Sequence, residues 1–245
     1  MIAKAFRSWT LAIALAGAST GCSAAPDDAT PDLATARLGL MTSLPIYWPE
    51  AHDVGELLEN GQKIGQARKA LETRYSLEPL DTLEADTLRG YDRLLLAQPR
   101  ALSPSENVAL DRWVRDGGRL LLFADPMLTV HSHFAVGDKR RAQDVILLSP
   151  ILAHWGLELT FDPDQPPSER QVEVEGIVLP IAQAGAFELR PGGGCDIAKS
   201  RILARCRIGR GSVTLVADAA VLDESESDAP LRARAVEQLS KLAFD

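Results

Sequence analysis

The chain has few of the residues from which enzyme sites are commonly built. Its 245 residues include three cysteines and four histidines, and no CxxC pair occurs. No serine or cysteine stands in a Gly-x-Ser-x-Gly or Gly-x-Cys-x-Gly elbow. The glycine run at 192–194 precedes a cysteine rather than opening a helix, so a turn explains it better than a phosphate-binding loop. The usual nucleophile and phosphate-binding motifs are therefore absent.

Basic residues are also fewer than acidic ones. Lysine and arginine together number 26 against 34 acidic residues, which gives a formal net charge of -8. Nucleic acids and anionic membrane surfaces are bound by basic patches, so we expect no nucleic-acid partner. Hydrophobic residues make up 46% of the chain, which is enough to build a core.

A stretch typical of a secretory signal begins the chain. Lys4 and Arg7 precede an apolar run at residues 9–18 that is too short to span a bilayer comfortably. Residues 19–22, Ser-Thr-Gly-Cys, resemble the lipobox of bacterial lipoproteins, with serine where leucine is usual. The resemblance implies lipidation of Cys22, and Ser23 after it favours the outer over the inner membrane. The alternative is cleavage after Ala18, which leaves Cys22 as a free thiol.

These features predict three segments and an envelope location. We expect a signal peptide at 1–21, a flexible tether at 22–34 and a single domain at 35–245. The tether residues are small, acidic and proline-containing. The protein would then be a periplasm-facing lipoprotein, with the membrane reached through its lipid.

Cys195 and Cys206 remain as a pair once Cys22 is lipidated. In an oxidising compartment a disulfide between them is expected, and it would close a loop of about a dozen residues. A metal site is the alternative, but no histidine lies near either cysteine.

The clearest structural pattern is a strand, helix and strand at residues 91–126. The apolar runs at 91–97 and 119–124 are typical of strands buried on both faces. Between them, Ser103 and Glu106 form a capping box around Pro104, and Gly117 and Gly118 end the helix. Two such strands joined by a helix predict a parallel βαβ unit.

Flanking patterns extend this unit into a larger sheet. We expect strands at 37–43 and 77–80 with a helix at 64–75 between them, and a final helix from about residue 228. A short helix is expected at 149–155, and an antiparallel insertion spans about 157–210. A hairpin then pairs residues 201–208 with 212–217. The fold class is α/β, an open, mostly parallel sheet flanked by helices.

Several of these segments resemble one family. The run Tyr91-Asp92-Arg93-Leu94-Leu95-Leu96, the Gly117-Gly118 helix end, Trp155-Gly156, and Gly209-Arg210-Gly211 leading to Ala217-Asp218 are similar to the periplasmic domain of gliding-motility-type ABC-transporter auxiliary proteins and related domains of unknown function. The resemblance implies a flavodoxin-like or glutamine-amidotransferase-like sheet without amidotransferase chemistry. It also implies ABC transporter subunits as partners. Those proteins normally carry a transmembrane helix, whereas this chain has no such stretch beyond the signal.

Candidate binding residues follow the predicted strands. Asp125 and Asp218 each end an apolar strand in Ala-Asp, at the sheet edge where ligands usually bind; the alternative is that they cap the following turns. Ser43, Tyr47 and Trp48 follow the first strand at the same edge. The aromatic rings there would stack on a sugar, pack against a partner or cover the core.

His131 and His133 are the candidate metal ligands. Two histidines two apart can face one side of an extended segment, and Asp125 or Asp218 would complete a divalent-metal site; the alternative is an exposed loop without metal. We expect no cofactor. The sequence thus favours a non-catalytic, lipid-anchored envelope protein that binds a partner or ligand as an accessory to an ABC transport system. The alternatives are a metal-assisted hydrolase or a degenerate small-molecule sensor.

Overall fold

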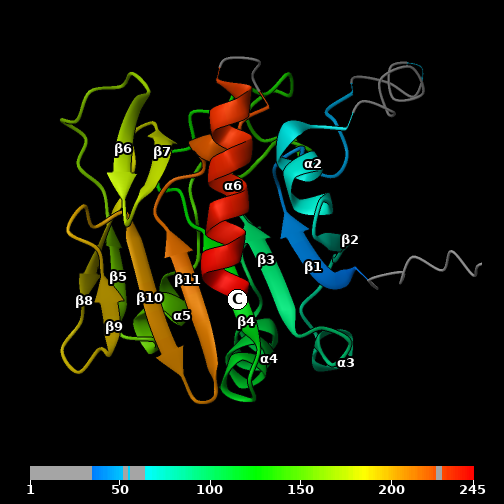
Figure 1. Ribbon diagram of the computed structural model, residues 1–245, viewed down its shortest axis with the longest axis vertical. Helices are drawn as coiled ribbons and strands as arrows, with labels where there is room; N and C mark the ends of the chain where they lie inside the picture. The colour runs from blue at the N-terminus through cyan, green and yellow to red at the C-terminus, as the bar shows by residue number, and fades with distance from the viewer. Residues whose placement is uncertain (1–34, 52–54, 56–63, 225–227) are drawn as a thin grey trace, which may run out of the picture. The chain divides into compact units, whose positions relative to one another are not determined.

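A seven-stranded sheet forms the centre of the protein (Figure 1). The computed structural model describes residues 35–51, 55, 64–224 and 228–245, so the predicted signal, the tether and Cys22 lie outside the described residues. The strand order is β2-β1-β3-β4-β11-β10-β9. These strands are β1 (Ala36–Thr42), β2 (Tyr75–Pro79), β3 (Arg93–Ala97), β4 (Arg119–Phe123), β9 (Cys195–Ile197), β10 (Leu203–Ile208) and β11 (Gly211–Val216).

The pairing confirms the predicted α/β fold. The neighbouring strands β2, β1, β3, β4 and β11 are parallel to one another, while β10 runs antiparallel to both β11 and β9. In the central register Leu94 of β3 lies beside Leu120 of β4, and Leu120 lies beside Val213 of β11. All three side chains are buried, as continuous apolar strands require when both faces of a sheet are covered.

Helices cover both faces and create two separate hydrophobic clusters (Figure 1). One cluster joins the sheet to α2 (Gln66–Glu72), the 3-10 turn η1 (Ala220–Leu222) and α6 (Ala229–Phe244). The other joins the opposite face to α3 (Ala85–Leu88), α4 (Pro104–Arg115) and α5 (Ser149–His154). None of the helices within the described residues is long and apolar enough to cross a membrane.

Helix α4 begins as its sequence predicts. The Ser103 side chain accepts a hydrogen bond from the Glu106 N–H, and the Glu106 carboxylate accepts one from the Ser103 N–H. Glu106 also accepts from the Leu83 N–H and pairs with Arg100 at 2.7 Å. The Arg100 guanidinium lowers the pKa of Glu106 to about 2, against the opposing effect of burial. The Glu106 side chain thus joins the start of α4 to the loops that contain Leu83 and Arg100.

The region between β1 and β3 departs from prediction. Helix α2 ends at Glu72, and Tyr75 begins β2 instead of ending the helix as expected. The Tyr75 ring is buried, and its centroid lies 5.6 Å from that of Phe244 on α6. Packing against a distant residue thus places Tyr75 in a strand, although its spacing in the sequence is helical. Helix α3 and strand β9 are short elements that the sequence pattern did not predict.

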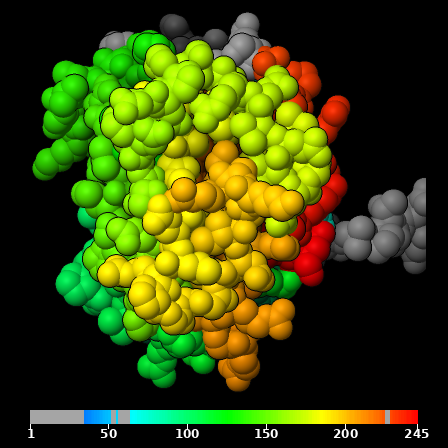
Figure 2. All heavy atoms as spheres, turned by 90° about the vertical axis from the view of Figure 1, so that its left-hand side faces the viewer, coloured from blue at the N-terminus to red at the C-terminus, as the bar shows by residue number. Residues whose placement is uncertain are grey.

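The predicted antiparallel insertion consists of two small paired units. Strand β5 (Leu157–Thr160) pairs with β8 (Ala186–Leu189), and β6 (Arg170–Val174) pairs with β7 (Ile177–Ile181). Residues of this insertion, yellow-green and yellow in Figure 2, make up much of the face on the β9 side of the molecule. Buried side chains of β7 join the cluster under α6, while Phe187 of β8 joins the opposite one.

The predicted disulfide joins Cys195 of β9 to Cys206 of β10. The two residues are direct partners in the antiparallel pair, and their Cα atoms are 4.2 Å apart. Both side chains are buried against the cluster beneath α4 and α5. Since β9 has only three residues, the covalent link secures an edge strand that has few hydrogen bonds of its own.

Loss of this link should lower stability without changing the fold. For the double variant Cys195→Ala/Cys206→Ala in a Cys22→Ser background, we expect the free energy of unfolding to fall by about 3 kcal/mol, because the unfolded chain gains entropy. Urea denaturation measures this change, and a reductant should destabilise only the protein that retains both cysteines. Two alkylatable thiols in the unreduced Cys22→Ser protein would contradict the disulfide.

Candidate functional site

The loops that follow β1, β3, β4 and β11 meet at one edge of the sheet, which we call the carboxyl edge. Ser43 follows β1, Gln98 follows β3, Asp125 follows β4 and Asp218 follows β11. Because these strands are parallel, their carboxyl ends lie side by side, and this is the edge where open α/β sheets usually bind ligands. The sequence-predicted residues that end strands are therefore brought together.

Gln98 is the centre of this edge, and sequence reasoning missed it. Its side chain is fully buried; Nε2 donates to the carbonyls of Asp125 and Gln143 at 2.9 and 2.8 Å, and Oε1 accepts from the Asp125 N–H at 2.9 Å. Its φ of 45° lies in the left-handed region, which non-glycine residues seldom adopt. A polar residue between a buried apolar strand and Pro99 was the available signal.

Ser43 extends this network to the loop after β1. Its hydroxyl donates to the Gln98 carbonyl at 2.5 Å and accepts from the Gln143 N–H at 3.0 Å. Both functions of the hydroxyl are thus used within the protein, and Ser43 connects three loops. The structure therefore gives Ser43 a positioning contact at the predicted edge.

Asp125 and Asp218 lie beneath the surface, each about 1% exposed. The oxygens of Asp125 accept from the N–H groups of Met127 and Ala219 at 2.8 and 3.0 Å. Those of Asp218 accept from Ala182 and Ala220 at 2.9 and 2.7 Å. Every carboxylate oxygen thus holds a backbone N–H, the geometry of the turn-capping alternative. We call Ser43, Gln98, Asp125 and Asp218 the carboxyl-edge network.

Burial makes these two carboxylates hard to ionise. It raises the pKa of Asp125 to about 6, although the N–H groups of Met127 and Ala219 oppose the shift. Burial also raises the pKa of Asp218, and the negative charge of Asp125 adds to that effect. The charged forms carry a desolvation cost that the four backbone N–H groups offset only in part.

The aromatic pair after β1 stands at the surface of this edge. Trp48 is 64% exposed, and its ring meets that of Tyr47 edge-on with centroids 4.9 Å apart. The Arg68 guanidinium lies 4.0 Å from the Tyr47 ring centroid and donates to the Tyr47 carbonyl at 2.9 Å. Tyr47 is therefore held in place, while Trp48 presents most of its indole to solvent.

Two hollows flank this loop. The larger, about 760 Å³, is lined by Tyr47, Glu50 and Lys69 among others, and the smaller, about 500 Å³, by Ser43, Trp48 and Arg140 among others. Both volumes fall in the range of small-molecule sites. Residues 44, 45, 47, 49 and 50 line both hollows, so the loop forms the wall between them.

His131 and His133 are exposed on the wall of the larger hollow, and Asp125 and Asp218 are not among the residues that line it. Glu50 is their acidic neighbour: it accepts hydrogen bonds from the Ser132 hydroxyl and the His133 N–H at 2.7 and 2.9 Å. Among the described residues, no group of three histidine, cysteine or acidic side chains is arranged to hold a metal ion. The arrangement thus offers a fixed aromatic surface and two hollows.

Comparison with known proteins identifies the family. The family described as an ABC-type uncharacterized transport system matches residues 35–164, more than half of the chain. The protein belongs to this family. The matched range includes β1 to β5 and hence Ser43, Trp48 and Asp125, but not Asp218. No curated protein matches the chain.

Several solved structures are similar to this family member. An exo-β-1,4-mannosidase from Opitutaceae bacterium strain TAV5 is 16% identical with a TM-score of 0.50, covering 86% of this chain and 36% of the enzyme. A β-galactosidase from Rahnella sp. R3 is 15% identical with a TM-score of 0.49, covering 84% and 31%. A ThuA-like protein from Bacteroides uniformis is 10% identical with a TM-score of 0.45, covering 88% and 96%. The chain spans about a third of the length of the two glycosidases.

The buried carboxylates predict a pH dependence of stability. Because the folded state retains a proton on Asp125 up to about pH 6 whereas the unfolded chain loses it near pH 4, stability should fall as pH rises between these values. For Asp125→Asn, this fall should shrink by roughly 1–2 kcal/mol. Urea denaturation from pH 4 to 7 tests it, with exposed Asp164→Asn as the control. An identical slope in wild type and Asp125→Asn would contradict the argument.

Proposed function

We propose that this family member is a non-catalytic accessory of an ABC transport system that binds a protein partner through the surface around Tyr47 and Trp48. The main observation is that Trp48 is 64% exposed, while the adjacent Tyr47 is held in place by a hydrogen bond from Arg68 to its carbonyl. Exposed aromatic side chains on rigid elements are typical of the residues that dominate protein interfaces. The family match supports the link to a transport system.

The chemistry of the carboxyl edge favours binding over catalysis. The carboxylate oxygens of Asp125 and Asp218 accept hydrogen bonds from backbone N–H groups. The Ser43 hydroxyl donates one hydrogen bond and accepts another within the protein. A partner would thus meet the aromatic loop and the two hollows, with the network acting as their support. A small ligand within either hollow remains compatible with this role.

The anchor is the second part of the proposal. We infer lipidation of Cys22 and attachment to the outer membrane, facing the periplasm, from the sequence of residues 1–23. A lipid at Cys22 followed by the tether at 23–34 would keep the folded domain near the membrane while leaving the carboxyl edge free to meet a partner.

Trp48→Ala should reduce partner capture. With a photo-crosslinking amino acid at position 49, irradiation of intact cells followed by purification and mass spectrometry should recover a transporter permease or ATPase. Trp48→Ala should lower that recovery about tenfold, as loss of an interface tryptophan does. Leu189→Ala, which removes a side chain 52% exposed on β8, is the matched control. Recovery of no transporter subunit, or equal recovery with Trp48→Ala, would contradict the proposal that this surface binds a transporter subunit.

Cys22→Ser should detach the protein from the membrane. We expect the wild-type protein in the membrane pellet, with its amino-terminal peptide heavier by the mass of the acyl groups, and the variant in the soluble fraction. The folded domain should have the same thermal midpoint in both. An unmodified Cys22 thiol in the wild-type protein would show that the alternative cleavage after Ala18 is used.

A further inference from the structure

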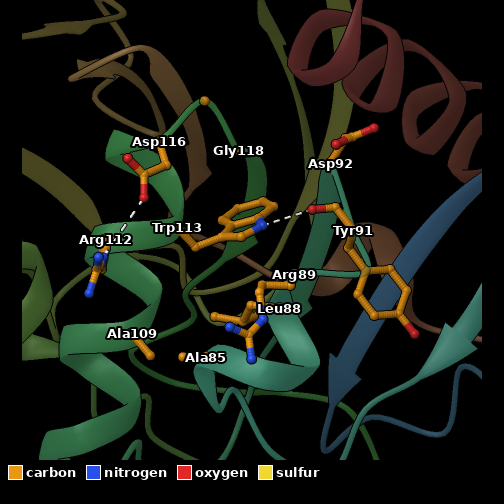
Figure 3. Close-up of a pocket in the computed structure, with 11 residues that line it drawn as sticks. Ala85, Leu88, Arg89, Tyr91, Asp92, Ala109, Arg112, Trp113, Asp116 and Gly118 are labelled. Carbon is orange, nitrogen blue, oxygen red and sulfur yellow. Dashed lines mark hydrogen bonds and ion pairs between the residues drawn. The ribbon is translucent and has the colours of Figure 1, made fainter.

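A third hollow, of about 440 Å³, lies at the opposite edge of the sheet, where β3 and β4 begin (Figure 3). It is lined by residues of α3, of the turn before β3, of α4 and of the two glycines before β4. Nothing in the proposed partner surface uses it, because that surface lies at the carboxyl ends of the strands. We call it the amino-edge hollow.

Trp113 of α4 forms the aromatic surface of this hollow, and the backbone fixes its orientation. Its indole Nε1–H donates to the Tyr91 carbonyl at 2.8 Å. A Cβ placed on Gly118 would lie 2.4–2.5 Å from three atoms of the indole's six-membered ring, so the glycine backbone stacks against one ring face. In Figure 3 the indole lies between Gly118 and the side chains of Leu88 and Arg89, which line the hollow with it.

The rim of the hollow carries as many positive as negative charges. Arg89 and Arg112 supply guanidinium donors, and Asp92 and Asp116 supply carboxylate acceptors. All four side chains belong to exposed residues. Arg89 also forms an ion pair with Asp86, and Asp116 lies 3.9 Å from Arg112 and 3.6 Å from Arg210. Such weak surface pairs exchange readily for hydrogen bonds to a ligand.

These features together select one kind of ligand. A rim without net charge favours an uncharged molecule, since a charged one would meet as much repulsion as attraction. Interspersed donors and acceptors suit hydroxyl groups, which both donate and accept. A fixed aromatic surface suits the apolar face of a ring. We propose that the amino-edge hollow binds an uncharged, hydroxyl-rich ring, that is, a neutral sugar unit.

The indole N–H of Trp113 provides a direct readout. In the folded protein with ¹⁵N labelling, the Trp113 Nε1–H resonance is assigned by its loss in Trp113→Phe. The probes are glucose, N-acetylglucosamine, mannose, maltose and trehalose, with glucuronate and glucosamine as charged comparisons. We expect at least one neutral sugar to shift the Trp113 and Gly118 resonances saturably, and both charged sugars to bind less tightly.

Two exposed arginines separate binding from folding. Arg112→Ala should weaken sugar binding about tenfold, the loss expected for one hydrogen bond to a charged donor. Arg234→Ala, an exposed arginine on α6 across the sheet, should leave the affinity unchanged, and both variants should keep the wild-type thermal midpoint. The proposal is overturned if no neutral sugar gives a saturable shift, if a charged sugar binds more tightly, or if Arg112→Ala binds as wild type does.

Discussion

The burial of backbone groups at the carboxyl ends of the parallel strands is the constraint on which the rest of this structure depends. Strands covered on both faces run directly into loops whose N–H and C=O groups have little access to water, and each unsatisfied group would cost about 1–3 kcal/mol. The carboxyl-edge network satisfies them with side chains. Gln98 supplies two donors and an acceptor, and each aspartate supplies two acceptors. The loops can therefore sit over the sheet without secondary structure of their own.

The choice of aspartate at positions 125 and 218 follows from the same constraint. Each side chain accepts from two separate backbone N–H groups, whereas an asparagine in the same place would turn an NH₂ group toward one of them. The contacts also join separate elements: Asp125 accepts from Ala219 after the neighbouring strand β11, and Asp218 accepts from Ala182 after β7 of the antiparallel insertion. Burial raises the pKa of both carboxyls, and the negative charge of Asp125 adds to the shift of Asp218.

Sequence reasoning was most successful where one local pattern dictates the structure. The β3-α4-β4 unit follows from apolar runs and a capping box, and the pairing of Cys195 with Cys206 follows from counting cysteines. Sequence reasoning failed where packing against residues distant in the chain determines the local secondary structure. Tyr75 continues the helical spacing of residues 64–71, yet its contact with Phe244, 169 positions away, places it in a strand.

The candidate sites show the same division. Strand-end aspartates could be located from their Ala-Asp endings, but only the structure shows that their oxygens are directed at backbone N–H groups. Gln98 could not be found by motif, because its role depends on loops that lie 27 and 45 residues away in the chain. The amino-edge hollow was not predicted for another reason: Trp113 lines it together with residues of α3 and with Gly118, which packs against its indole, and the sequence pattern does not show that these residues meet.

The two edges of the sheet differ in how their aromatic groups are held, and this difference bears on what each can bind. Trp48 stands out from a loop, with its edge against Tyr47 and most of its surface in water, so a large partner can enclose it. Trp113 is fixed on one face by Gly118 and at its nitrogen by Tyr91, and its ring lines a confined hollow. A protruding ring suits a protein surface, whereas a recessed and oriented ring suits a ligand of its own size. The strands separate the two edges, and the hollows at the two edges share no lining residue.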